Sequence, residues 1–228
     1  YIYKKSLKKH KKRIFKKTDK SNKKKYDFEE IKNAVRKLNI KDGDILLVHS
    51  SMESFDNFNI TANEIINFLI DIVGPNGTLV MPTFPKFKKK SENGIYIYDR
   101  KKTMSWTGLI TNAFLFYPEV IRSEYPFNTL AAYGKYADEM MKNNLFAKYP
   151  HGDNSAWKFC LDNNAKILFL GAKSSNSNTM AIHMAPDILE DKWPIKNWYK
   201  NDKIIIKREK ENMIYEYSYQ DGFWYKYC

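Results

Sequence analysis

Apolar residues along this chain follow two patterns with different periods. Uninterrupted apolar runs at residues 45–48, 78–81 and 167–170 are typical of strands that are buried on both faces. After Thr61, apolar residues recur at helical spacing, and Glu64 completes the Thr-x-x-Glu capping box that begins a helix. The order of strand, helix, turn and strand predicts a βαβ unit with parallel pairing.

The remaining segments complete the predicted fold. Residues 86–103 are polar and basic, which predicts a mobile loop or flap around a short strand at 95–98. Apolar and polar residues alternate over 202–219, which predicts an antiparallel hairpin. Additional helices are predicted over residues 27–38, 109–116, 135–141 and 155–161. We therefore predict an α/β fold, with a single domain over residues 26–228 whose central mixed, largely parallel sheet is flanked by helices and followed by an antiparallel C-terminal hairpin.

The net charge of +13 comes almost entirely from the beginning of the chain. Residues 1–25 hold 13 Lys or Arg and one acid, so the rest of the chain is close to neutral. We predict a flexible basic arm, which can touch anionic surfaces by counterion release, although lysine also simply keeps such a segment solvated. Because no basic stripe continues into the core, no specific nucleic-acid partner is predicted.

Composition and spacing exclude several other classes. No apolar run reaches the roughly 20 residues of a spanning helix, and the opening residues lack the pattern of a secretory signal, so a cytoplasmic location is expected. Cys160 and Cys228 are too few for a disulfide framework, and the four histidines are dispersed, so no metal site is predicted. Cys160 is expected to be a small buried apolar residue. The glycine spacings of nucleotide loops and of the hydrolase elbow are absent.

Polar residues at predicted strand ends remain as candidates for a site. Ser50 and Ser51 follow the first buried strand, and ligands of open α/β sheets bind beyond strand carboxyl ends. Their hydroxyls and backbone N–H groups suit a phosphate or an amide, but they also suit the last backbone groups of the strand. Arg122 and Ser123 suit the same anion, and the alternative for Arg122 is a surface ion pair with Glu124.

Five segments in order carry a resemblance to a known family. They read Asp44-Ile-Leu-Leu-Val-His-Ser-Ser-Met52, Gly74-Pro-Asn-Gly-Thr-Leu-Val-Met-Pro-Thr-Phe84, Arg122-Ser-Glu-Tyr-Pro126, Lys166-Ile-Leu-Phe-Leu-Gly171 and Asn178-Thr-Met-Ala-Ile-His183. Their order and spacing resemble the aminoglycoside 3-N-acetyltransferase family. The resemblance implies transfer of acetyl from acetyl-CoA to an amine of a small-molecule amino sugar, without a metal.

The resemblance also implies roles for particular residues. His183 corresponds to the family's proposed general base, and a histidine that titrates near pH 6.5 can take the proton of the attacking amine. Asp99 and Tyr125 are assigned to the acceptor side. The residues assigned to coenzyme A are Ser50, Ser51, Met52, Arg122, Ser123 and Thr179.

Two positions depart from the family pattern. Tyr125 stands where the family has a histidine, and a phenol with a pKa near 10 is no base at neutral pH. Pro186 stands where the family has a glutamate that would orient the histidine. Asp187, four residues after His183, is predicted to lie on the same helical face and to replace that glutamate. Proline suits the first turn of a helix and would distort a longer one.

Two alternatives therefore stay open beside aminoglycoside acetylation. A polycationic acceptor requires an acidic pocket, whereas the loop over residues 86–102 carries six lysines, which suits a nucleotide-linked amino sugar better. The departures at Tyr125 and Pro186 also fit a degenerate protein that binds coenzyme A or a sugar without turnover.

Overall fold

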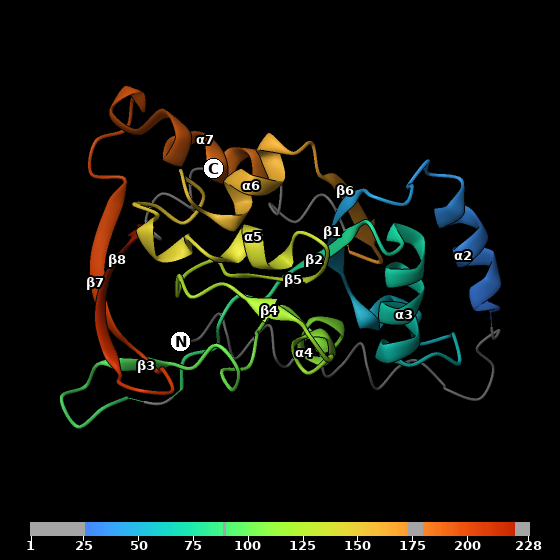
Figure 1. The fold of residues 1–228 in the computed structure, drawn as a ribbon, viewed down its shortest axis with the longest axis horizontal. Helices are drawn as coiled ribbons and strands as arrows, with labels where there is room; N and C mark the ends of the chain where they lie inside the picture. The colour runs from blue at the N-terminus through green and yellow to red at the C-terminus, as the bar shows by residue number, and fades with distance from the viewer. Residues whose placement is uncertain (1–25, 89, 173–179, 222–228) are drawn as a thin grey trace, which may run out of the picture.

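The computed structural model describes residues 26–88, 90–172 and 180–221, with the backbone alone for 180–183. Its central sheet has five strands in the order β4-β5-β2-β1-β6 (Figure 1). Their bounds are β1 Ile45–Ser50, β2 Thr78–Pro82, β4 Ile121–Arg122, β5 Leu130–Gly134 and β6 Lys166–Leu170. Strand β1 is parallel to β2 and to β6, whereas β5 is antiparallel to both β2 and β4. The predicted mixed sheet is confirmed, with its three central apolar runs as the parallel part.

Helices cover both faces of this sheet (Figure 1). One face packs against α2 Phe28–Arg36, α3 Ala62–Val73 and α4 Leu109–Leu115, and the other against α5 Ala137–Met141, α6 Ala156–Asp162 and α7 Met180–Leu189. Along β1, Leu46 and Val48 enter the first core, while Ile45 and Leu47 enter the second. Because successive side chains of a strand point to opposite faces, a strand covered on both faces must be apolar throughout.

Local signals place the helix boundaries. The predicted capping box is present at the start of α3, where Thr61 and Glu64 satisfy each other's backbone N–H groups. Ser155 caps α6 by accepting from the backbone of Lys158. Short 3-10 turns occupy Met52–Phe55, Asn144–Phe146 and Glu190–Lys192. Cys160 lies in the core as expected, where burial raises the pKa of its thiol to about 12.

A second, three-stranded sheet lies beside the first (Figure 1). The predicted hairpin is confirmed as β7 Tyr199–Ile206 and β8 Met213–Gln220, and β3 Tyr96–Tyr98 joins it parallel to β7. The segment expected to be a flap is thus paired with the hairpin through β3. Tyr98 is fully buried there, and its hydroxyl donates to the Ser123 carbonyl at 2.6 Å, which links the two sheets.

No helix within the described ranges combines the length and the apolar composition that a membrane span requires. The predicted basic arm at residues 1–25 lies outside the described residues.

Candidate active site

The carboxyl ends of β1 and β6 are held tightly together. The Ser51 N–H donates to the Leu170 carbonyl at 3.1 Å, and the Ser54 hydroxyl donates to the Gly171 carbonyl at 2.6 Å. Gly171 has a positive φ of 71°, and a Cβ added to it would lie 2.7 Å from the Ser54 Cβ. Glycine is therefore required here, because any side chain would push the two strand ends apart.

Two buried polar atoms at the end of β1 lack a protein partner. Neither the Ser50 Oγ nor the His49 Nε2 has a hydrogen-bond partner in the part of the chain that the structure describes. His49 stacks on Phe169 at 5.1 Å, and burial lowers the pKa of its imidazole. Buried polar groups in native proteins are nearly always satisfied, so an orphaned pair at a strand end points to a ligand or to water. His49 was not singled out from the sequence, although it belongs to the quoted His-Ser-Ser segment.

A buried arginine lies at the same edge of the sheet. Strand β1 is paired with β2 through Leu47 and Val80, so Ser50 and Thr83 stand three residues further along neighbouring strands about 4.8 Å apart. Arg122 is only 3% exposed and donates to the carbonyls of Thr83 and Thr103. The structure therefore brings Ser50 and Arg122, predicted separately, to one end of the sheet.

The Arg122 site is electrically unbalanced. The Arg122 Nε also donates to the Thr129 hydroxyl at 3.2 Å, and its guanidinium carbon lies 5.3 Å from the centre of the Tyr98 ring. Burial lowers the pKa of Arg122, but a guanidinium keeps its proton in proteins. No carboxylate pairs with it among the described residues, so neutral oxygens and a ring face hold the cation.

The alternative of a surface ion pair between Arg122 and Glu124 is wrong. Arg122 is buried, and Glu124 instead pairs with Arg100 at 3.5 Å and with Arg208 at 2.7 Å. Strand β4 places Arg122 opposite Ala131, which directs its side chain over the first core rather than outward.

Ser123 and Tyr125 are used within the fold. The Ser123 Oγ accepts from the Tyr125 N–H at 3.1 Å, and the Tyr125 hydroxyl donates to the Ser218 carbonyl on β8 at 2.8 Å. Burial raises the pKa of Tyr125, with Tyr215 and Asp187 adding to the effect. Tyr125 therefore stays protonated and ties this segment to the hairpin. Its contact with an acceptor stays a prediction.

Asp99 organises a turn beside Arg122. Its Oδ1 accepts from the backbone N–H groups of Lys101 at 3.0 Å and Lys102 at 3.1 Å, and its carbonyl accepts from the Thr103 N–H at 2.7 Å. This turn places the Thr103 carbonyl that Arg122 binds. Direct contact of Asp99 with an acceptor stays a prediction.

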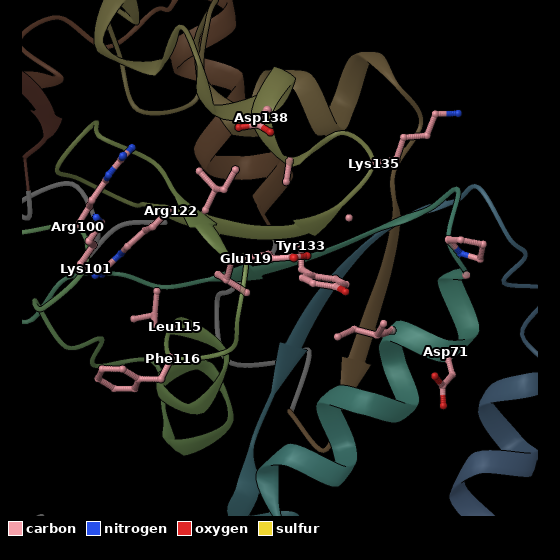
Figure 2. A pocket seen from close by; sticks show the side chains of 17 residues that line it. Asp71, Arg100, Lys101, Leu115, Phe116, Glu119, Arg122, Tyr133, Lys135 and Asp138 are labelled. Atoms are coloured by element: carbon pink, nitrogen blue, oxygen red, sulfur yellow. The ribbon is translucent and has the colours of Figure 1, made fainter.

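A groove of about 1220 Å³ runs along the β4 side of the sheet (Figure 2). Arg100, Lys101 and Arg122 lie together at one end of it, and Asp71 lies at the other. Arg122 is the member of the predicted site that lines this groove, so the groove extends away from the ends of β1 and β6. Its basic end suits an anionic group.

Helix α7 carries the predicted base. Residue Thr179 and the side chain of His183 lie outside the described part of the chain, so their roles stay predictions. Pro186 lies within the helix, which continues to Leu189; the expectation that proline would be confined to a first turn is therefore wrong. Met52 begins a 3-10 turn and packs against the first core, directly after the strand end.

Asp187 makes contacts that the sequence did not predict. Its Oδ2 accepts from the backbone N–H and the Nδ1 of His151, both at 2.8 Å. Its Oδ1 accepts from the Tyr199 hydroxyl at 2.5 Å and from the Gln220 amide at 3.2 Å. His151 lies 36 residues before Asp187, and no local spacing signals the pair. Whether Asp187 also orients His183 stays a prediction.

Comparison with known proteins places these residues in a family. A family model described as aminoglycoside 3-N-acetyltransferase matches residues 47–225. Aminoglycoside N(3)-acetyltransferase IX of Micromonospora chalcea is 27% identical over 157 residues, covering 62% of this chain and 56% of that protein. The SPbeta prophage-derived aminoglycoside N(3')-acetyltransferase-like protein YokD of Bacillus subtilis (strain 168) is 28% identical over 169 residues, covering 66% of this chain and 61% of that protein. The match thus spans less than two thirds of either relative.

Solved structures agree with this assignment. The crystal structure of YokD has a TM-score of 0.68 at 27% identity and covers 85% of this chain and 81% of that chain. AAC-IIIb in a binary complex with CoASH has a TM-score of 0.72 at 17% identity, covering 86% and 76%. AAC-VIa bound to sisomicin has a TM-score of 0.71 at 19% identity, covering 87% and 77%; these last two show the shared fold alone. With the family match extending over most of its length, the chain belongs to the aminoglycoside 3-N-acetyltransferase family.

Proposed function

We propose that this protein is an N-acetyltransferase that moves the acetyl group of acetyl-CoA to an amine of an amino sugar. The observation that carries the proposal is the family match over residues 47–225, which includes every residue assigned to the site. The structure of AAC-IIIb with CoASH on the same fold supports coenzyme A as the carrier. Acetyl-CoA supplies an activated acyl group, and the chain supplies binding, orientation and proton transfer.

The cofactor side of the proposed site is the common edge of β1, β2 and β6. The unpartnered Ser50 Oγ and the backbone of Ser51 and Met52 offer hydrogen bonds to the amides of pantetheine. Arg122 is a buried cation without a carboxylate partner in the described residues, and the phosphates of coenzyme A would balance its charge. Ser123 holds the segment that carries Arg122, and Thr179 is assigned to the region of the thioester.

The proposed base is His183. As the amine nitrogen bonds to the acetyl carbon, the carbon–sulfur bond breaks and the proton that the nitrogen loses passes to the imidazole. Such proton transfer contributes about a hundredfold to ten-thousandfold in rate. We expect His183→Ala to lower kcat by that factor with little change in the Kd for acetyl-CoA.

An aminoglycoside-like acceptor is favoured over a nucleotide-linked sugar. The basic residues beside Asp99 are partly neutralised, because Lys101 pairs with Glu209 at 2.8 Å and both Arg100 and Arg208 pair with Glu124. Neighbouring structures hold sisomicin in AAC-VIa and a gentamicin in an AAC(3)-IVa variant. The degenerate alternative rests on Tyr125 and Pro186 and predicts binding without turnover.

The deciding experiment has two stages. Calorimetry with acetyl-CoA tests the cofactor site, and a thiol-release assay then compares sisomicin, gentamicin and a uridine-diphosphate amino sugar as acceptors. His183→Ala is compared with His10→Ala, which removes a histidine from the basic arm. Wild-type turnover that His183→Ala abolishes and His10→Ala preserves supports the proposal. Near-normal turnover in His183→Ala refutes the assigned base, and acetyl-CoA binding without turnover on any acceptor supports the degenerate alternative.

A further inference from the structure

A single buried carboxylate connects α7 to three other parts of the fold. Asp187 is 1% exposed, and its two oxygens together accept four hydrogen bonds. The donors are His151 in the loop before α6, Tyr199 on β7 and Gln220 at the end of β8. A buried carboxylate is tolerated when its oxygens are satisfied in this way, and removing its donors leaves an uncompensated charge.

The histidine of this cluster is also held from its far side. His151 is 0% exposed, and its Nε2 lies 3.3 Å from the Nδ2 of Asn128. With that amide as donor, Nε2 accepts, and the ring proton is on Nδ1, where it is donated to Asp187. The Asn128 carbonyl in turn accepts from the Trp157 Nε1 at 2.7 Å, so α6 fixes the asparagine.

The cluster is continuous with the edge of the sheet. Asn128 directly precedes Thr129, whose hydroxyl donates to the Thr83 carbonyl at 2.6 Å and accepts from Arg122. A connected series of hydrogen bonds therefore runs from α7 through His151 to the strand end where the cofactor site is proposed. Such a series transmits position, because each member has few alternative partners in the interior.

Helix α7 needs bracing from outside. Pro186 lies within it and has no N–H to donate to the preceding turn, which weakens the helical hydrogen bonding next to Asp187. Asp187 follows His183 by four residues, about one turn, so fixing Asp187 fixes the rotation and the depth of the turn that carries His183.

We propose that His151 and Asp187 form a positioning pair for acetyl transfer. The pair holds α7 against the loop before α6 and against the hairpin, and so sets the place of His183 relative to the cofactor edge. Neither residue touches the reacting atoms. The inference rests on the proposed function. A displacement of about 1 Å at a reacting group can cost a hundredfold in rate, which sets the size of the expected effect.

Two substitutions at one position separate positioning from simple packing. His151→Asn keeps an N–H donor near the place of Nδ1, whereas His151→Phe keeps an aromatic ring and removes both nitrogens. We expect His151→Phe to lower kcat about a hundredfold while the Kd for acetyl-CoA changes less than threefold, and His151→Asn to recover at least tenfold of that loss. Equal losses in the two variants, or an unchanged kcat in His151→Phe, would overturn the proposal.

A milder variant covers the case in which His151→Phe does not fold. Tyr199→Phe removes one hydroxyl donor from Asp187 and keeps the ring that stacks on Tyr149 at 3.9 Å. We expect a threefold to tenfold fall in kcat. Tyr117→Phe is the control, since it removes a hydroxyl that donates to Asn67 at 2.9 Å. A kcat for Tyr199→Phe equal to that of Tyr117→Phe would contradict the positioning role.

Amide hydrogen exchange tests the bracing without any need for turnover. His151→Asn and Tyr199→Phe should each speed exchange over residues 180–189 relative to wild type, Tyr199→Phe by at least threefold, while exchange over 62–73 stays unchanged. Unchanged exchange in α7 would refute the positioning pair. If α7 exchange responds as expected but wild type transfers no acetyl group to any acceptor, the bracing holds and the proposed function fails.

Discussion

Removing the buried charge of Arg122 offers a quantitative test of the strand-end site. Arg122→Met keeps the length of the side chain and removes the donors to Thr83, Thr103 and Thr129. The Thr83 carbonyl keeps the Thr129 hydroxyl at 2.6 Å, whereas the Thr103 carbonyl loses its donor. One stranded buried acceptor costs about 1–3 kcal/mol of unfolding free energy. For a chain of this size, that corresponds to a fall in Tm of roughly 2–12 °C.

The same substitution should weaken cofactor binding. A charge-assisted contact with phosphate is worth about 1.5–3 kcal/mol, so the Kd for acetyl-CoA should rise by roughly tenfold to a hundredfold. Thermal denaturation and calorimetry on the same preparation give both quantities.

Arg208→Met is the matched control for Arg122→Met. Arg208 pairs with Glu124 at 2.7 Å with 41% of its side chain exposed, and such exposed pairs contribute about 0–1 kcal/mol. We expect a small change in Tm and none in the Kd for acetyl-CoA. If both variants melt alike, Arg122 is not held as described. If Arg122→Met is destabilised but binds acetyl-CoA normally, the cation supports the fold and does not anchor the cofactor.

Three further predictions concern other parts of the chain. Gly171→Ala should destabilise the protein more than Gly94→Ala, because both glycines have positive φ but only the first is crowded; equal melting temperatures would contradict this. Thr61→Ala should cost about 1 kcal/mol in urea unfolding by removing the cap of α3, and no change would mean that the cap is dispensable. Hydrogen bonds to Thr61 lower the pKa of Glu64, so its stabilising contact is complete above pH 4.5 and is lost as the pH falls through the folded-state pKa; Glu64→Gln should therefore differ from wild type in unfolding free energy at pH 7 and converge with it in acid. At pH 8 the thiol of Cys160, with its pKa raised to about 12, should react with a disulfide reagent far more slowly in the native protein than in urea, and similar rates would refute its burial.

Local sequence determined the elements and the type of sheet. The continuous apolar runs that contain Leu46 and Leu47 encode strands buried on both faces, since every residue of such a strand meets a core. The Thr61 cap and the polar–apolar alternation of the hairpin involve neighbours within one element, so they can be seen in the sequence. The family resemblance was likewise carried by ordered local segments and is confirmed.

Tertiary structure alone decided which polar groups meet. Arg122 was compatible from sequence with the surface, and its burial depends on carbonyls contributed by Thr83 and Thr103 from other segments. Asp187 was expected to serve its own helix, yet it binds His151, 36 residues away, together with donors from the hairpin. Periodicity reports which face of an element is buried, but hydrogen bonds between distant segments depend on how those faces dock, and no local pattern records that.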